Sequence, residues 1–89
     1  MDSAAREFLS SLLSTPSPSG YEQPVQRLVR DYLGACADRI TTDSHGNVIG
    51  RKEGVGQTRM LLAGHCDQIG LIVQFIDSDG FIHGWALGL

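Results

Sequence analysis

The sequence predicts an α/β fold in which two helices come first and short strands follow. Three observations support this order. Apolar residues recur at helical spacing as far as Leu33. From Ile40 onward the apolar stretches are short and are separated by turns rich in Gly and Asp, as between strands. One of these stretches, Met60–Ala63, is a continuous apolar run, which is typical of a strand buried on both faces.

The first helix is predicted over residues Ser3 to Leu13, with Asp2 or Ser3 as its N-cap. Phe8, Leu9, Leu12 and Leu13 supply its apolar spacing. The helix is expected to end before Pro16 and Pro18, because each proline removes a backbone donor and forces its predecessor out of the helical region. A short, stiff connector is therefore expected before the second helix.

The second helix is predicted from the clearest apolar stripe in the chain. Its members are Val25, Leu28, Val29, Tyr32 and Leu33. The stretch Ser19–Glu22 has the form of a capping box, although Pro24 favours a helix that begins at Tyr21 or Glu22. Gly34 is expected to end the helix.

Two β-hairpins are predicted in the second half of the chain. Their strands are expected at Arg39–Thr42 and Asn47–Arg51, and at Leu71–Ile76 and Phe81–Leu87. The first turn contains Gly46, which can adopt positive φ. The buried strand at Met60–Ala63 lies between the hairpins in sequence. A strand at the end of the sequence would have an unpaired edge, so we expect the chain to be a truncated part of a longer protein.

The composition is that of an ordinary globular domain, with 89 residues, 42% of them hydrophobic, and a net charge of -3. No cluster of Lys and Arg supports nucleic-acid binding, and no apolar stretch approaches the roughly 18 residues of a membrane span. The two cysteines, Cys36 and Cys66, have neither disulfide-framework nor zinc-ribbon spacing. They fit a reducing compartment, so a cytoplasmic location is expected.

The strongest local signal for chemistry is His65 and Asp67, which follow the predicted buried strand directly. Ligands of open α/β sheets gather at the carboxyl ends of strands, and residues i and i+2 of an extended segment share a face. From spacing alone two interpretations remain open: a metal-ligating histidine supported by a carboxylate, or a hydrogen-bonded structural pair. Cys66 is expected to face away. His45 is predicted to be exposed in a turn, and His83 to be a surface or edge residue.

Four stretches, taken together and in order, resemble the opening of one enzyme family. They are Ser17–Glu22, Thr42–Ile49, Gly64–Val73 and Asp79–Ile82. The family is that of the metallo-aminopeptidases of the glutamyl, deblocking and tetrahedral type, some of which have been labelled endoglucanases. The resemblance implies that the full-length parent removes N-terminal residues from peptides. It also implies a large homo-oligomer, commonly a dodecamer.

The same resemblance assigns roles to particular residues. It implies that His65 ligates one of two catalytic divalent metal ions, zinc or cobalt, and that Asp67 is a catalytic residue that steadies His65. It implies an α/β catalytic domain over residues 1–68, and the start of an inserted, barrel-like β domain for oligomerisation over residues 69–89. The family usually has glutamate where this chain has Gln68, which removes a charge near the site.

The other ligands and the general base are expected beyond residue 89, so the chain alone is expected to be inactive, because a catalytic metal site needs about three protein ligands. A non-catalytic folding or interaction module remains an alternative function. Polysaccharide hydrolysis is a weaker alternative, because it typically needs two flanking carboxylates. The sequence leaves open the preferred substrate residue and the choice between zinc and cobalt.

Overall fold

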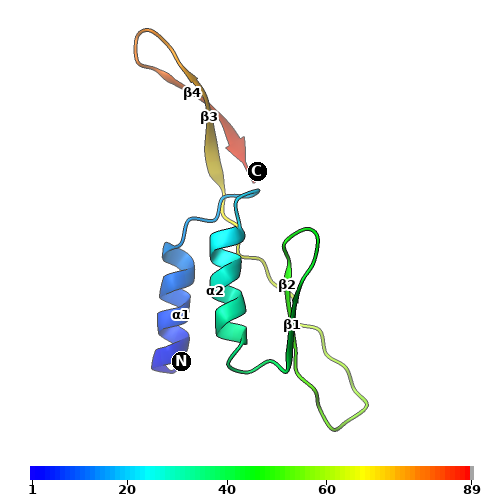
Figure 1. The fold of residues 1–89 in the computed structure, drawn as a ribbon. Helices are drawn as coiled ribbons and strands as arrows, with labels where there is room; N and C mark the ends of the chain where they lie inside the picture. The colour runs from blue at the N-terminus through cyan, green and yellow to red at the C-terminus, as the bar shows by residue number, and fades with distance from the viewer. Residues whose placement is uncertain (89) are drawn as a thin grey trace.

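The computed structural model describes residues 1–88, and Leu89, the end of the predicted 69–89 unit, lies outside the described residues. Helix α1 (Ser3–Ser14) and helix α2 (Gln23–Leu33) lie side by side and run in opposite directions (Figure 1). The rings of Phe8 and Tyr32 stack between them, with centroids 3.8 Å apart. The first helix is confirmed together with its cap, since the Ala5 amide donates to the Asp2 carboxylate at 2.7 Å.

The predicted capping box at the start of α2 is wrong. The helix begins at Gln23 with Glu22 as its N-cap, and no side chain caps it. Pro24 occupies the first turn, where its missing amide hydrogen costs nothing. The hydroxyl of Ser19 bonds to a distant residue instead, and the Glu22 carboxylate accepts from the Gly20 amide at 2.6 Å. Gly34 is the C-cap, as predicted, with helical φ.

The first predicted hairpin is confirmed as strands β1 (Arg39–Thr42) and β2 (Val48–Arg51), which pair antiparallel. Its turn is organised by Asp43, whose carboxylate accepts hydrogen bonds from the His45 and Asn47 amides at 2.9 Å each. Asn47 belongs to this turn rather than to the strand. Gly46 has φ of 89°, which is the positive value expected there.

Helix α2 packs against this hairpin through Gly50 of β2. A Cβ atom at Gly50 would lie 3.1 Å from Leu33 Cδ1 and 3.5 Å from Ala37 Cβ. The absence of a side chain therefore lets the end of the helix approach the strand closely. Val25 on α2 is the one fully buried hydrophobic residue of the described chain, and Ser17 is the one fully buried polar residue.

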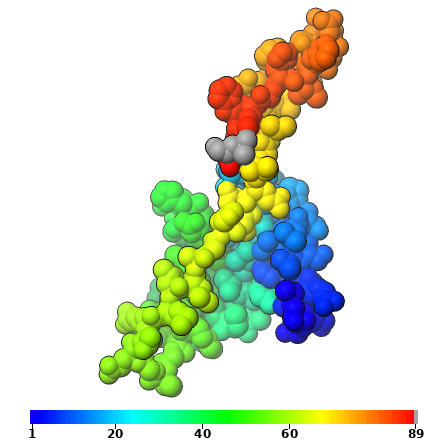
Figure 2. All heavy atoms as spheres, turned by 180° about the vertical axis from the view of Figure 1, so that it is seen from behind, coloured from blue at the N-terminus to red at the C-terminus, as the bar shows by residue number. Residues whose placement is uncertain are grey.

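The prediction of a buried strand at Met60–Ala63 is wrong for the described part of the chain. The segment crosses the back of the molecule without pairing in a sheet (Figure 2). The side chains of Leu61 and Leu62 are each 87% exposed. A strand exists only where a neighbouring strand accepts and donates its backbone hydrogen bonds, and residues 1–88 supply no such neighbour here.

The second predicted hairpin is confirmed as strands β3 (Gly70–Ile76) and β4 (Ile82–Leu87), with an irregularity between Val73 and Phe75. The hairpin projects from one end of the helix pair (Figure 1), and the molecule measures 64 × 30 × 18 Å. Most large apolar side chains of the β3–β4 hairpin are more than half exposed, among them Ile72, Phe75, Ile82 and Trp85. Within residues 1–88, no helix is long and apolar enough to cross a membrane.

His83 lies on this hairpin, as predicted, and contacts two side chains. Its ring stacks on Phe75 with centroids 4.1 Å apart, and its Nε2 lies 2.9 Å from Asp77 Oδ2. The other oxygen of Asp77 accepts from the Asp79 and Phe81 amides at 3.0 and 2.9 Å. Hydrogen bonds from His83 and from these turn amides lower the pKa of Asp77.

The tip of this hairpin is expected to loosen in acid. Because the folded-state pKa of Asp77 is depressed, its stabilisation is complete above the unfolded-state pKa of about 3.9 and is lost as pH falls through the lower folded value. An NMR titration should show the Phe81 amide proton shifting upfield over that interval. In Asp77→Asn, which keeps an acceptor oxygen but does not titrate, this shift should vanish. An unchanged Phe81 titration in the variant would contradict the assignment.

Candidate functional site

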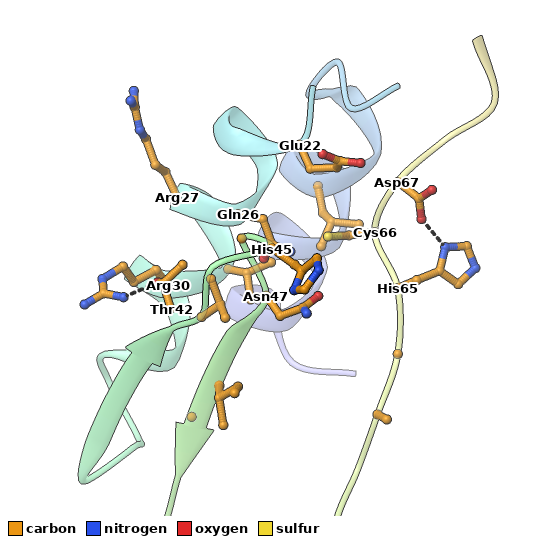
Figure 3. A pocket seen from close by; sticks show the side chains of 18 of the residues that line it. Glu22, Gln26, Arg27, Arg30, Thr42, His45, Asn47, His65, Cys66 and Asp67 are labelled. Atoms are coloured by element: carbon orange, nitrogen blue, oxygen red, sulfur yellow. Dashed lines mark hydrogen bonds and ion pairs between the residues drawn. The ribbon is translucent and has the colours of Figure 1, made fainter. Parts of the chain in front are cut away.

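His65 and Asp67 lie at the end of the extended segment and are in direct contact. His65 Nδ1 is 2.8 Å from Asp67 Oδ1. Both side chains lie on the side of the segment that faces away from the helices (Figure 3). The predicted shared face is therefore confirmed. The His65 side chain is 85% exposed, and its Nε2 takes part in none of the hydrogen bonds found among residues 1–88.

The tautomer of His65 follows from this contact. An ionised carboxylate can only accept hydrogen bonds, so Nδ1 of a neutral ring must carry the proton that the bond needs. The lone pair then lies on Nε2, which is open to solvent. A metal-ligating histidine typically has this arrangement, with one nitrogen held by a carboxylate and the other free to bind. His65 could therefore hold a metal ion through Nε2.

Ser19, from the connector between the helices, also contacts Asp67. Its hydroxyl donates to Asp67 Oδ2 at 2.7 Å, so the two oxygens of this carboxylate have different partners. The Ser19 hydroxyl and the His65 ring stabilise the ionised form and lower the pKa of Asp67. Asp67 is thus held as an anion next to the histidine. Ser19 was not predicted as part of the site, because Ser19–Glu22 matches a helix-capping pattern.

The connector also holds the backbone of the site, through a clasp formed by residues 17–19 and 66–68. The Gln68 amide donates to the Ser17 carbonyl at 2.7 Å, and the Ser19 amide donates to the Gln68 carbonyl at 3.2 Å. The buried Ser17 hydroxyl donates to the Cys66 carbonyl at 2.9 Å. These bonds fix the segment on either side of Asp67. The two prolines of the connector keep it extended and available for this pairing.

Cys66 points the other way, as predicted, toward the helices and a groove between them and the extended segment (Figure 3). The groove has a volume of about 810 Å³ and is lined by residues of both helices, of the β1–β2 hairpin and of the segment 61–67. Burial raises the pKa of the Cys66 thiol, and the charges of Asp67 and Glu22 add to this effect. A thiol kept protonated is a poor nucleophile and a poor metal ligand.

The other histidines are not part of this pair. His45 is exposed in the turn after β1, as predicted, with its amide bonded to Asp43. His83 is engaged by Asp77 on the projecting hairpin. In the part of the chain that the structure describes, no three His, Cys, Asp or Glu residues converge to hold a metal ion. Because catalytic zinc sites use about three protein ligands, the donor set fits one ligand and its support, not a whole site.

Comparisons with known proteins point to aminopeptidases. A model of the M42 glutamyl aminopeptidase family matches residues 46–88. A lysyl aminopeptidase of Pyrococcus furiosus is 36% identical over 92% of this chain and 24% of its own length. The putative aminopeptidase FrvX of Escherichia coli is 33% identical over 92% of the chain and 23% of its own length. A [LysW]-lysine hydrolase of Deinococcus radiodurans is 35% identical over 91% of the chain and 22% of its own length.

A solved aminopeptidase structure has a fold similar to that of this chain. The TET aminopeptidase from the marine sediment archaeon Thaumarchaeota archaeon SCGC AB-539-E09 superposes with a TM-score of 0.85 at 32% identity. The match covers 96% of this chain and 24% of that protein. The predicted order of two helices and then antiparallel strands is therefore confirmed as the N-terminal part of an aminopeptidase fold.

These matches define the class first: in sequence and in fold, the chain is similar to part of an aminopeptidase. More narrowly, residues 46–88 match the M42 glutamyl aminopeptidase family, in agreement with the resemblance noted in the sequence, and the chain is similar to about a quarter of the length of such relatives. The chain spans less than a quarter of the length of each relative named above.

Proposed function

We propose that the protein containing this chain is a metal-dependent aminopeptidase that hydrolyses N-terminal residues from peptides. The observation that carries the proposal is the His65–Asp67 contact, which lies within the residues matched by the aminopeptidase family model. In this proposal His65 ligates one of two divalent metal ions, zinc or cobalt, through Nε2. Asp67 holds the ring in the required tautomer.

When bound, the metal ions would polarise the scissile carbonyl and lower the pKa of an attacking water. The contribution of this chain is to orient one ligand. Further ligands and a general base would come from residues outside 1–89, since the relatives are about four times as long. The 89 residues alone are then expected to be inactive. The exposed position of His65 leaves room for such residues beside it.

The remaining parts of the proposal concern organisation. Residues 1–68 would belong to the catalytic domain, and residues 69–89 would begin an inserted β domain that serves oligomerisation, in an assembly as large as a dodecamer. The exposed apolar side chains of the projecting hairpin support a role in assembly, because such surfaces are typical of contacts. A cytoplasmic location is supported by Cys36 and Cys66, which are both free thiols.

The experiment is to express the longest open reading frame that contains these residues, beside the 89-residue chain. Metal content is measured by elemental analysis, and hydrolysis is measured on chromogenic aminoacyl substrates. The panel should include lysyl and glutamyl substrates, because one relative is a lysyl aminopeptidase and the matching family is that of the glutamyl aminopeptidases. The longer protein should bind about two metal ions and cleave, and chelation should abolish cleavage. Full activity after complete metal removal would contradict the proposal.

A second candidate is a non-catalytic interaction module, favoured by the same exposed hairpin. It predicts self-association of the longer protein without metal-dependent hydrolysis, so the same experiment separates the two. The alternative of polysaccharide hydrolysis is disfavoured, because that reaction typically uses two carboxylates that flank the scissile bond, and Asp67 is engaged by Ser19 and His65.

A further inference from the structure

The contacts of Asp67 lead to an inference about Ser19, which rests on the proposed function. We propose that Ser19 is a positioning residue: its hydroxyl sets the orientation of the Asp67 carboxylate, and through it the ring of the metal ligand His65. We propose further that Gly88, at the far end of the second hairpin, lacks a side chain because one would displace this hydroxyl.

The first step is the division of the two carboxylate oxygens. Oδ2 accepts from Ser19 Oγ at 2.7 Å, and Oδ1 meets His65 Nδ1 at 2.8 Å. A carboxylate with one oxygen engaged cannot rotate without breaking that bond. The Ser19 hydroxyl therefore holds the other oxygen toward the ring, in the way that outer partners typically orient metal-ligating histidines.

The second step separates this role from holding the backbone. The bonds from the Gln68 amide to Ser17, and from the Ser19 amide to Gln68, use main-chain atoms only. The buried Ser17 hydroxyl adds a bond to the Cys66 carbonyl. None of them needs the Ser19 hydroxyl. Removing that hydroxyl should therefore leave the clasp closed and free only the carboxylate.

The third step concerns the end of β4, which returns to the connector between the helices (Figure 1). Gly88 has φ of 77°, and a Cβ atom there would lie 2.8 Å from Ser19 Oγ. It would also lie 3.5 Å from the Ile69 Cα atom. A side chain at 88 must push the hydroxyl aside, because the backbone on its other side cannot yield easily. The hairpin is thereby coupled to the orientation of Asp67.

Four variants test the proposal. Ser19→Ala removes the hydroxyl, whereas Ser19→Thr keeps a hydroxyl at this position. Gly88→Ala displaces it from the other end of the chain. Gly80→Ala is the matched control, since Gly80 has a similar φ of 86° but open space where its Cβ would lie. Any strain from positive φ alone is then common to both alanine variants, and circular dichroism checks that each is folded.

The first readout needs no metal. In the 89-residue chain with ¹⁵N-labelled histidine, at a pH where the ring is neutral, the nitrogen shifts of His65 report its tautomer. The unmodified chain should show predominantly the Nδ1–H form. Ser19→Ala and Gly88→Ala should shift the His65 nitrogen signals toward a mixture of the two tautomers. Ser19→Thr and Gly80→Ala should keep the original signals.

The second readout is the metal affinity of the longer protein, which should fall about 10- to 100-fold in Ser19→Ala and Gly88→Ala. Ser19→Thr should restore it. The proposal is overturned if Ser19→Ala changes neither the tautomer nor the affinity, or if Gly80→Ala reproduces the loss. If the longer protein binds no metal while the tautomer still depends on Ser19, the proposed function fails and the positioning by Ser19 stands.

Discussion

Replacing His65 with alanine in the longer protein is expected to remove one of its metal ions and to lower kcat/KM by about 10³-fold or more. The reason is that a bound metal ion contributes several kcal/mol of transition-state stabilisation, and about 4 kcal/mol corresponds to a factor of 10³. The measurement is metal content by elemental analysis, followed by hydrolysis of the best substrate in the panel.

The controls for this prediction are the other histidines of the chain. His45→Ala changes an exposed turn residue, and His83→Ala changes the projecting hairpin, so both should retain the full metal content. Adding metal in excess should not restore the His65 variant, because the ligand itself is missing. Unchanged metal content in His65→Ala would rule out its role as a ligand.

Val25→Ala is expected to have the largest effect on the stability of the 89-residue chain, with a loss of about 2 kcal/mol in the free energy of unfolding. Val25 lies on α2 and is the one fully buried hydrophobic residue of the described chain. A chain this short buries little surface, so its stability is marginal and such a loss would unfold much of the population.

The matched control is Val55→Ala, because Val55 lies in a loop with its side chain completely exposed. The same two methyl groups are removed, but from water rather than from the core, and stability should change by less than about 0.5 kcal/mol. Urea unfolding followed by circular dichroism measures both variants. Equal midpoints for the two would show that α2 is not held by the packing of Val25.

Local patterns in the sequence predicted most of the elements. The apolar stripe of α2, the Asp2 cap and the Asp43–Gly46 turn depend on residues a few positions apart, so their physics is contained in a short stretch of chain. Met60–Ala63 shows the limit of this reasoning. Its apolar run has the composition of a buried strand, but burial and pairing depend on neighbours that residues 1–88 do not provide.

Ser19 shows the same limit at the site. The local pattern Ser19–Glu22 predicted a cap, because serine and glutamate three apart commonly bond across a helix start. In the structure the hydroxyl reaches Asp67 instead, a residue 48 positions away. Such a partner cannot be found from spacing, because only the folded path of the chain brings the two residues together.

The sequence by itself therefore determined the helices, the two hairpins, the family resemblance and the pairing of His65 with Asp67 on one face. These follow from periodicities of 3.6 and 2 residues and from motifs in register. Only the tertiary structure decided that the connector clasps residues 66–68, that Ser19 holds Asp67 and that Gly88 lies against Ser19. Those contacts join residues far apart in the chain, and their geometry is set by packing.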